Sequence, residues 1–134
     1  MIVQFSSGVR DGRANAVEST IGVSPTLKVF DGSIPANCAA ADAGTVLATI
    51  ALPSDWMAAS SGGVIAKTGT WQDASSDNSG TAQYWRLYRS GGACDMQGDI
   101  TNQAGTGSMK VTDTAFTAGL PFTVLTFGWT EGNA

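Results

Sequence analysis

The residue types that most often carry out chemistry in proteins are scarce in this chain. None of its 134 residues is a histidine, which removes the commonest metal ligand and the side chain best suited to proton transfer near neutral pH. A serine nucleophile would therefore need a lysine as its base, with Lys28, Lys67 or Lys110 buried in a pocket that no sequence pattern indicates. We expect no enzymatic activity and no catalytic residue.

The carboxylates do not form a pattern typical of catalysis or of metal binding. Asp95 and Asp99 are four positions apart, which in a strand places them on one face about 13 Å from each other, too far for a glycosidase pair. Asp73, Asp77 and Asn78 are loosely similar to a calcium loop, but the alternating ligands and the final glutamate of an EF-hand are missing. We expect no metal ion and no cofactor.

The chain has two cysteines, Cys38 and Cys94. Neither belongs to a closely spaced pair of the kind that binds zinc. The sequence favours two reduced, buried thiols over a disulfide and leaves the second alternative open. The first ten residues lack the basic start and apolar run of a signal peptide, which favours folding in a cytoplasm.

Composition excludes two classes of partner. Only 13% of the residues are charged, the net charge is −4 and Lys plus Arg number seven, so the chain offers no basic patch for a phosphate backbone. The longest uncharged run, residues 114–130, contains Gly119 and Pro121 and is shorter than the roughly 20 apolar residues of a membrane span. We expect no nucleic-acid partner and no membrane segment. A surface with so few charges suits burial against other subunits.

Residues 1–24 form the first expected segment, built around a helix over residues 6–21. Val9, Val17 and Ile21 fall on one face of that helix. Gly22 can end it with a positive φ, and Pro25 prevents it from resuming. The apolar stripe either contacts another subunit or covers the open end of the chain's own β domain, and both readings stay open.

Residues 25–134 form the second segment, in which short β-branched or aromatic runs alternate with turn residues. This pattern predicts a mainly β chain, an antiparallel β-sandwich of jelly-roll or immunoglobulin-like type that makes one globular domain with the N-terminal α-helix. The expected strands are residues 26–30, 45–52, 63–66, 69–72, 83–89, 95–101, 108–112 and 122–130.

Aromatic residues are the other candidates for a functional role. Trp71, Trp85 and Trp129 fall inside expected strands, where they are more typical of a core or a subunit interface than of a sugar-stacking platform. Trp56 and Met57 follow Pro53 in a turn, where they either cap one end of the sandwich or contact a partner. The candidate subunit-contact residues are therefore Val9, Val17, Ile21, Trp56 and Met57.

Eight segments that span nearly the whole chain resemble a family of small virion proteins of tailed bacteriophages. They are residues 14–22 (ANAVESTIG), 24–32 (S-P-x-L-x-V-F-D-G), 35–42 (PANCAAAD), 47–57 (LATIALPSDWM), 69–71 (GTW), 84–88 (YWRLY), 94–98 (CDMQG) and 129–134 (WTEGNA). The resemblance implies a structural protein of the virion, made in the host cytoplasm, that decorates or cements the capsid. The implied partners are copies of itself, as a dimer or trimer, and the major capsid protein. A tail or fibre position and a glycan-binding module are the alternatives.

Overall fold

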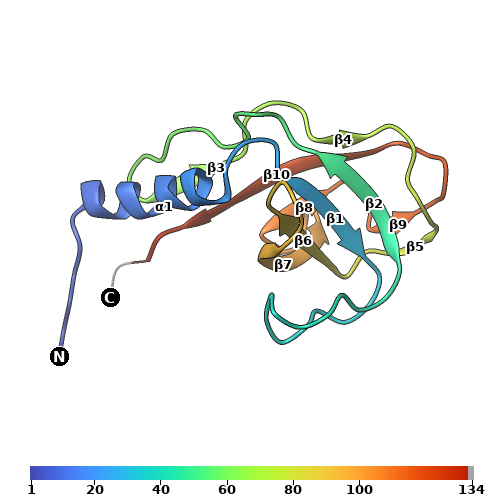
Figure 1. Cartoon of the computed structure of the whole chain (residues 1–134), viewed down its shortest axis with the longest axis horizontal. Helices are drawn as coiled ribbons and strands as arrows, with labels where there is room; N and C mark the ends of the chain where they lie inside the picture. Colours follow the sequence, from blue (N-terminus) through green and yellow to red (C-terminus); the bar gives the residue numbers. More distant parts are fainter. Residues whose placement is uncertain (133–134) are drawn as a thin grey trace.

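The computed structural model describes residues 1–132, so the end of the WTEGNA segment lies outside the described residues. The chain is mainly β, with one N-terminal helix, α1 (Ser7–Ile21). Figure 1 shows α1 at one end of the molecule, beside β3 and the end of β10. The strands are β1 (Thr26–Phe30), β2 (Val46–Ala51), β3 (Val64–Ala66), β4 (Gln72–Asp73), β5 (Gly80–Thr81), β6 (Tyr84–Tyr88), β7 (Cys94–Asn102), β8 (Met109–Val111), β9 (Ala115–Phe116) and β10 (Phe122–Thr130).

Most strands belong to one mixed sheet with the order β2-β1-β6-β7-β8-β10-β3, and β4 also pairs with β10. The two remaining strands, β5 and β9, form a separate ribbon. The sheet curls (Figure 1), so that β4, which pairs with β10 near one edge, lies beside β2 at the other edge. There the backbone N–H of Thr49 donates to Asp73 Oδ2 at 3.0 Å. The prediction of a mainly β chain with an N-terminal helix is confirmed. The jelly-roll or immunoglobulin-like type of sandwich stays a prediction.

The expectation that all strands pair antiparallel is wrong at one position. β7 and β8 are parallel, with Ile100 opposite Met109, although only six residues connect them. Gly105 and Gly107 make this short return fit, because a Cβ at Gly105 would lie 2.5 Å from the side chain of Thr101, and one at Gly107 would lie 2.9 Å from its backbone nitrogen. Parallel strands usually need a much longer connection, so the sequence pattern favoured the wrong direction.

The expected strand boundaries agree best for the long, strongly patterned runs. Residues 26–30 and 122–130 coincide with β1 and β10. Of the expected strand over residues 69–72, only Gln72 is in a strand, because Gly69 takes a positive φ of 72° and the chain turns there. The two-residue strands β5 and β9 were not expected, since runs that short carry no periodicity.

A row of aromatic rings forms the centre of the core. The rings of Trp56 and Trp71 lie 6.4 Å apart, those of Trp71 and Phe127 lie 5.0 Å apart, and Phe127 meets Trp85 edge-on at 4.9 Å. Trp56 and Trp71 are 0% exposed and Trp85 and Phe127 are 2% exposed. The row runs from the end of α1 to the middle of the sheet, so it joins the helix and the strands in one hydrophobic core.

The helix begins one residue later than predicted, at Ser7, and ends where the sequence predicts. The hydroxyl of Ser6 caps the N-terminus by accepting from the backbone N–H of Val9 at 3.3 Å. Gly22 ends the helix with a φ of 91°, and its N–H donates to the carbonyl of Glu18 at 2.9 Å. Throughout residues 1–132, no helix has both the length and the apolar character that crossing a membrane requires.

Candidate interaction surface

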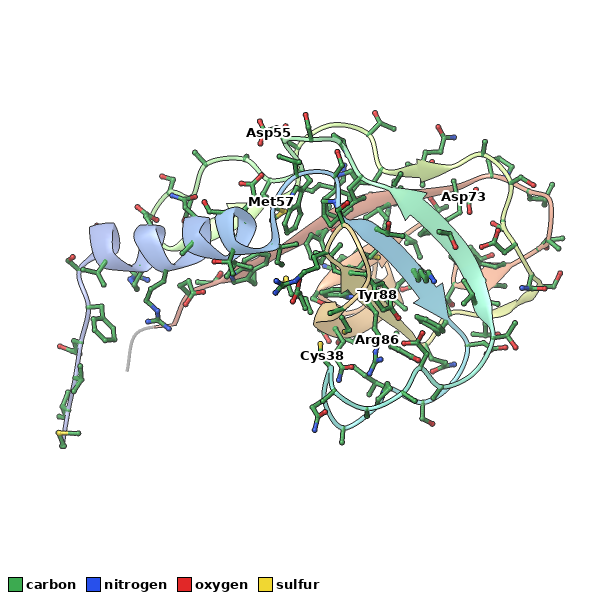
Figure 2. The ribbon with its side chains drawn as sticks, in the orientation of Figure 1. Cys38, Asp55, Met57, Asp73, Arg86 and Tyr88 are labelled. Atoms are coloured by element: carbon green, nitrogen blue, oxygen red, sulfur yellow. The ribbon has the colours of Figure 1, made fainter. Side chains whose placement is uncertain are left out.

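The turn after Pro53 closes over the C-terminal end of α1. Trp56 Nε1 donates to the carbonyl of Gly22 at 3.0 Å, and the backbone N–H of Met57 donates to Glu18 Oε1 at 3.1 Å. Trp56 is 0% exposed and Met57 2% exposed, and Figure 2 shows Met57 at the junction between helix and sheet. Of their two expected roles, these residues therefore cap the β domain. We correct their place among the candidate contact residues, because both side chains are enclosed by their own chain.

A second set of hydrogen bonds fastens the middle of α1 to the loop before β3. Asp11 Oδ1 accepts from the hydroxyl of Ser60 at 2.8 Å and from the backbone N–H of Gly63 at 2.6 Å. Asn15 Oδ1 accepts from the backbone N–H of Ser60 at 2.9 Å. The bond from Gly63, followed by that from Ser60, lowers the pKa of Asp11 below its ordinary value. The helix is therefore a fixed part of the domain.

The apolar stripe of α1 divides along its length. Ile21 is 8% exposed and belongs to the hydrophobic core, and Val17 is partly buried against that core. Val9, near the start of the helix, is 48% exposed. The C-terminal half of the stripe therefore covers the chain's own domain, as one of the two alternatives held, whereas Val9 stays available for another molecule.

An open groove of about 450 Å³ runs between α1, β7 and the end of β10. Apolar atoms of Val17, Met96 and Trp129 line it, with Ala16 on the helix side. Its rim carries charges that are already paired: Arg13 binds Glu131 at 3.0 Å, and Arg89 binds Asp95, another lining residue, at 2.7 Å. The groove is thus an apolar hollow with a polar, internally neutralised rim.

The N-terminal segment extends the apolar surface beyond the helix. Met1, Ile2 and Val3 are 115%, 83% and 45% exposed, and Figure 1 shows this segment leaving the start of α1 in an extended form. The guanidinium of Arg13, which lines the groove, lies 5.3 Å from the ring centre of Phe5. Residues 1–3 and Val9 thus lie before and at the start of the helix whose later residues line the groove. We call them together the helix-side surface.

The four tryptophans differ in what they could contact. Trp56, Trp71 and Trp85 are at most 2% exposed, so the expected core role is confirmed for Trp71 and Trp85, and none of the three rings can stack on a sugar. Trp129 is partly buried, lines the groove and donates from Nε1 to Glu131 Oε1 at 3.3 Å. Within the described chain, Trp129 is thus the tryptophan placed to meet another molecule.

One buried polar cluster was not expected from the sequence. Arg86, in the central strand β6, is 2% exposed. Its Nη1 lies 2.7 Å from Asp42 Oδ1, its Nη2 donates to the carbonyl of Asn37 at 3.0 Å, and its Nε donates to Gln97 Oε1 at 3.1 Å. Burial, the largest single influence, would lower the pKa of Arg86, but the bond to Asp42 and the neighbouring Cys94 and Tyr88 together outweigh it, and the pKa lies above its ordinary value. The cluster fastens the residues between β1 and β2 onto β6.

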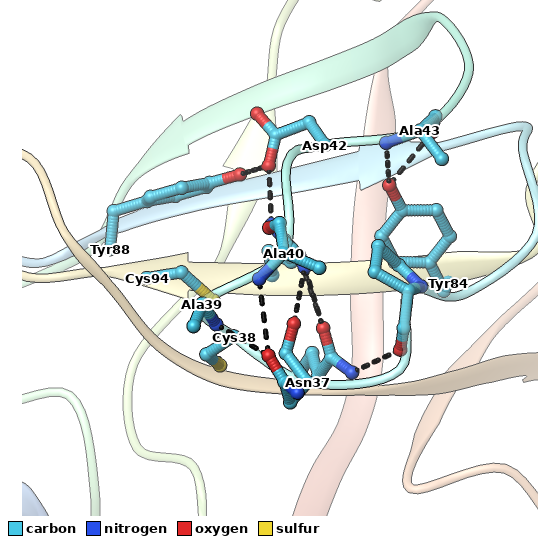
Figure 3. A network of polar contacts seen from close by, with 12 residues as sticks. Asn37, Cys38, Ala39, Ala40, Asp42, Ala43, Tyr84, Tyr88 and Cys94 are labelled. Atoms are coloured by element: carbon cyan, nitrogen blue, oxygen red, sulfur yellow. Dashed lines mark hydrogen bonds and ion pairs between the residues drawn. The ribbon is translucent and has the colours of Figure 1, made fainter.

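A signal for this cluster was present in the alternation of β6. Tyr84, Arg86 and Tyr88 share one face of a strand whose other face is apolar, and a strand buried on both faces must satisfy any charge that it carries. Tyr84 donates to the carbonyl of Ala43 at 2.7 Å, and Tyr88 donates to Asp42 (Figure 3). The strand is central in the sheet, because β6 lies between β1 and β7.

No family model, curated protein or solved structure matches this chain.

The polar groups that the sequence singled out for chemistry are used inside the fold. Asp73 and Asp77 accept hydrogen bonds from the backbone N–H and the hydroxyl of Thr49, at 3.0 and 2.8 Å, and so cover the outer edge of β2. Among residues 1–132, no three His, Cys, Asp or Glu side chains are grouped where they could hold a metal ion. The helix-side surface carries no such group, and the chemistry it offers for binding is apolar contact.

Proposed function

We propose that this protein is a non-enzymatic structural protein of a tailed-bacteriophage virion, which decorates or cements the head by binding shell subunits through its helix-side surface. The observation that carries the proposal is the apolar groove beside α1, together with exposed Val9 near the start of that helix and exposed Met1 to Val3 before it. The resemblance of eight segments of the chain to small virion proteins supports the same role.

The energetics of the surface fit a binding role. Contiguous exposed apolar area on a folded domain is typical of a protein contact, and burying a Val, Ile or Met side chain stabilises a complex by about 1.5–3 kcal/mol. The helix that carries the surface is held by Trp56, Glu18 and Asp11, so little conformational freedom is lost on binding. Repeated copies on a symmetric shell multiply a modest affinity.

The major capsid protein is the proposed partner, with self-association into a dimer or trimer on the shell and the virion as the location. A tail or fibre position is the alternative that the same surface allows. The glycan-binding alternative has only Trp129 as a partly exposed tryptophan, and its ring shares the groove with aliphatic side chains. The virion role therefore accounts for more of the surface than sugar stacking does.

The test of location compares phage particles made with and without this protein by negative-stain electron microscopy and mass spectrometry. We expect the protein in purified particles and extra density, spread over the head, that is absent from particles lacking it. Density confined to the tail would replace the head role by the alternative. Absence from particles, together with saturable oligosaccharide binding by the isolated chain in calorimetry, would overturn the virion proposal.

The test of the surface adds purified variants to particles that lack the protein and measures co-sedimentation. Ala16→Glu places a carboxylate in the groove from an exposed helix position. We expect binding at least about tenfold weaker, a change of about 1.4 kcal/mol. Leu120→Glu is the matched control, because Leu120 is 57% exposed and lies in the loop before β10, at the other end of that strand. Equal losses in both variants would contradict binding through the groove.

A further inference from the structure

We propose that Cys38 and Cys94 form a reversible disulfide in an oxidising environment. This bond joins the β1–β2 segment, residues 31–45, to β7. The inference is independent of the virion proposal, since it follows from the contact of the two thiols. The sulfur atoms lie 2.7 Å apart although the residues are 56 positions apart in the chain. Figure 3 shows the two side chains facing each other across the segment and β7.

Other contacts hold the two thiols in place, so their approach does not depend on the sulfurs themselves. Asn37 Oδ1 accepts from the backbone N–H groups of Ala39 and Ala40, at 3.0 and 3.1 Å, and shapes the turn that carries Cys38. Arg86 donates to the carbonyl groups of Asn37 and Ala40 on either side of that turn. The turn is therefore fastened to β6, the strand that pairs with the strand of Cys94.

Strand β7 holds the β1–β2 segment at a second point. Gln97, on β7 close to Cys94, donates from Nε2 to the carbonyl of Pro35 at 2.7 Å and accepts from Arg86. The β1–β2 segment is thus bound before and after Cys38 by groups on β6 and β7. A fold that has already closed the loop between two thiols raises their effective concentration toward each other.

Both thiols are open to a small oxidant, because both are partly exposed. Burial, and then the hydrogen bond and charge of Cys38, raise the pKa of Cys94 to about 12. Cys94 therefore stays a thiol near neutral pH, and we assign the first attack to Cys38. Because the neighbouring charge of Cys38 is lost once its sulfur is bonded, Cys94 is then better placed to ionise and attack in turn.

The reaction balances with a small disulfide, such as oxidised glutathione, as the oxidant. The Cys38 thiolate attacks one sulfur of that disulfide, a mixed disulfide forms, and one glutathione thiolate leaves. The Cys94 thiolate attacks Cys38 Sγ, the Cys38–Cys94 bond forms, and the second glutathione thiolate leaves. Two protein thiols are oxidised, one small disulfide is reduced to two glutathione thiols, and the two protons lost by the protein thiols end on the glutathione sulfurs.

The bond would stabilise the fold because it closes a long loop in the unfolded chain. The β1–β2 segment is mostly exposed and contributes few apolar side chains to the core, so its attachment depends on polar contacts that solvent can replace. A covalent bond to β7 removes that weakness. We expect the thermal midpoint of the oxidised protein to exceed that of the reduced protein by at least about 5 °C.

The experiment equilibrates the full chain in glutathione buffers of increasing oxidised fraction, quenches by alkylation, and measures intact mass and mapped peptides. We expect a monomer lacking two hydrogen atoms and a linked peptide pair that contains Cys38 and Cys94. The effective concentration of the two thiols should be at least about tenfold higher in the native protein than in concentrated urea. A native value equal to the urea value, or oxidation only between molecules, would overturn the proposal.

Two serine variants provide the control. Cys38→Ser and Cys94→Ser replace one thiol by a side chain of similar size, and circular dichroism checks that each variant folds. In the same buffers, Cys94→Ser should keep one glutathione adduct on Cys38, because the second attack is lost, and neither variant should gain thermal stability on oxidation. A midpoint that rises as much in Cys38→Ser as in the natural chain would show that the intramolecular bond is not the cause.

Discussion

Strand β6 and helix α1 both carry side chains on two faces, and the chain covers them to different extents. In β6, Trp85 and Leu87 enter the core on one face, and Tyr84 and Arg86 are buried beneath the β1–β2 segment on the other. In α1, the buried residues are Ala14 and Ile21, while the start of the helix and the groove beside it stay open. The chain covers or pairs the side chains of its central strand on both faces, whereas it covers those of its helix only in part.

This difference separates stability from binding. A region whose polar and apolar groups all have partners within the chain contributes to the free energy of unfolding and has nothing left for another molecule. A region that keeps exposed apolar area on a fixed backbone contributes little to unfolding and is available for contact. Substitutions in the closed region should therefore lower stability, and substitutions in the open region should lower binding while stability stays the same.

The largest effect is expected where the closed region meets the helix. Trp56→Ala removes a side chain that is 0% exposed and deletes the hydrogen bond to the carbonyl of Gly22. We expect the free energy of unfolding in urea to fall by about 3–5 kcal/mol, because a large cavity opens in the core. Trp56→Phe, which keeps most of the ring volume, should lose less. A change below about 1 kcal/mol for Trp56→Ala would contradict its capping role.

The next largest effect is expected at the buried guanidinium. Arg86→Met removes the donors that satisfy Asp42, Gln97 and the carbonyl of Asn37. We expect urea unfolding to show a loss of about 2–3 kcal/mol, somewhat below the full cost of orphaning a buried charge, because the side chain of Asp42 is 41% exposed.

The control for this variant lies at the end of the same strand. Arg89→Met breaks the ion pair with Asp95, in which the Arg89 side chain is 49% exposed. Surface ion pairs of this kind contribute about 0–1 kcal/mol, so the two substitutions should differ clearly in unfolding free energy. Equal losses would mean that burial of Arg86 adds nothing to its contribution.

The same contrast explains which parts of the structure were predictable. The helix, β1 and β10 follow from periodicity and turn residues within a short stretch, and their positions agree with the sequence prediction. The burial of Trp56 depends on the end of α1, more than 30 residues away, so local sequence left both capping and a partner contact open for the turn after Pro53. The helix-side surface was predictable in part, since Val9 was identified, but the groove needs Met96 and Trp129 from two distant strands.

Long-range placement also accounts for the other differences. The burial of Arg86 requires the carbonyl groups of Ala40 and Asn37, which lie 46 and 49 positions away in the sequence. The parallel pairing of β7 with β8 depends on the close approach of Gly105 and Gly107 to Thr101, which no periodicity reveals. The meeting of Cys38 and Cys94 depends on the same loop. In each case a tertiary contact decides between local alternatives.

A smaller effect, with a defined pH dependence, is expected at Glu18, where helix and turn meet. Burial, and then the nearby Asp55 carboxylate, raise the pKa of Glu18 above its ordinary value, although the N–H of Met57 opposes them. A raised folded-state pKa means that stability present at low pH is lost as pH rises through that pKa. Glu18→Gln keeps an acceptor for Met57 and removes the charge.

We therefore expect Glu18→Gln to unfold at slightly higher urea than the natural chain near neutral pH, by under about 1 kcal/mol, with no gain well below its ordinary pKa. The stability contributed by Asp11 should depend on pH in the opposite direction. Its pKa is lowered by Gly63 and Ser60, so the stability it contributes is present above the ordinary pKa of an aspartate and is lost as pH falls through the lowered value. A gain for Glu18→Gln that persists unchanged in acid would contradict the assignment.

The smallest change in stability is expected in the open region, at Val9, and there the two properties should move in opposite directions. Ser6 caps α1 and Val9 is the third residue of the helix, so Val9→Glu completes the Ser-x-x-Glu capping box and places a negative charge at the positive end of the helix dipole. We expect the free energy of unfolding to stay the same or rise by up to about 0.5 kcal/mol, while binding to particles weakens because an exposed valine is replaced by a charge.

Val9→Lys removes the same apolar contact but opposes the dipole, so it should weaken binding equally and lower stability slightly. Unfolding in urea and co-sedimentation with particles, measured on both variants, separate the two contributions. If Val9→Glu binds as well as the natural chain, Val9 is not part of the contact, and the helix-side surface reduces to the groove.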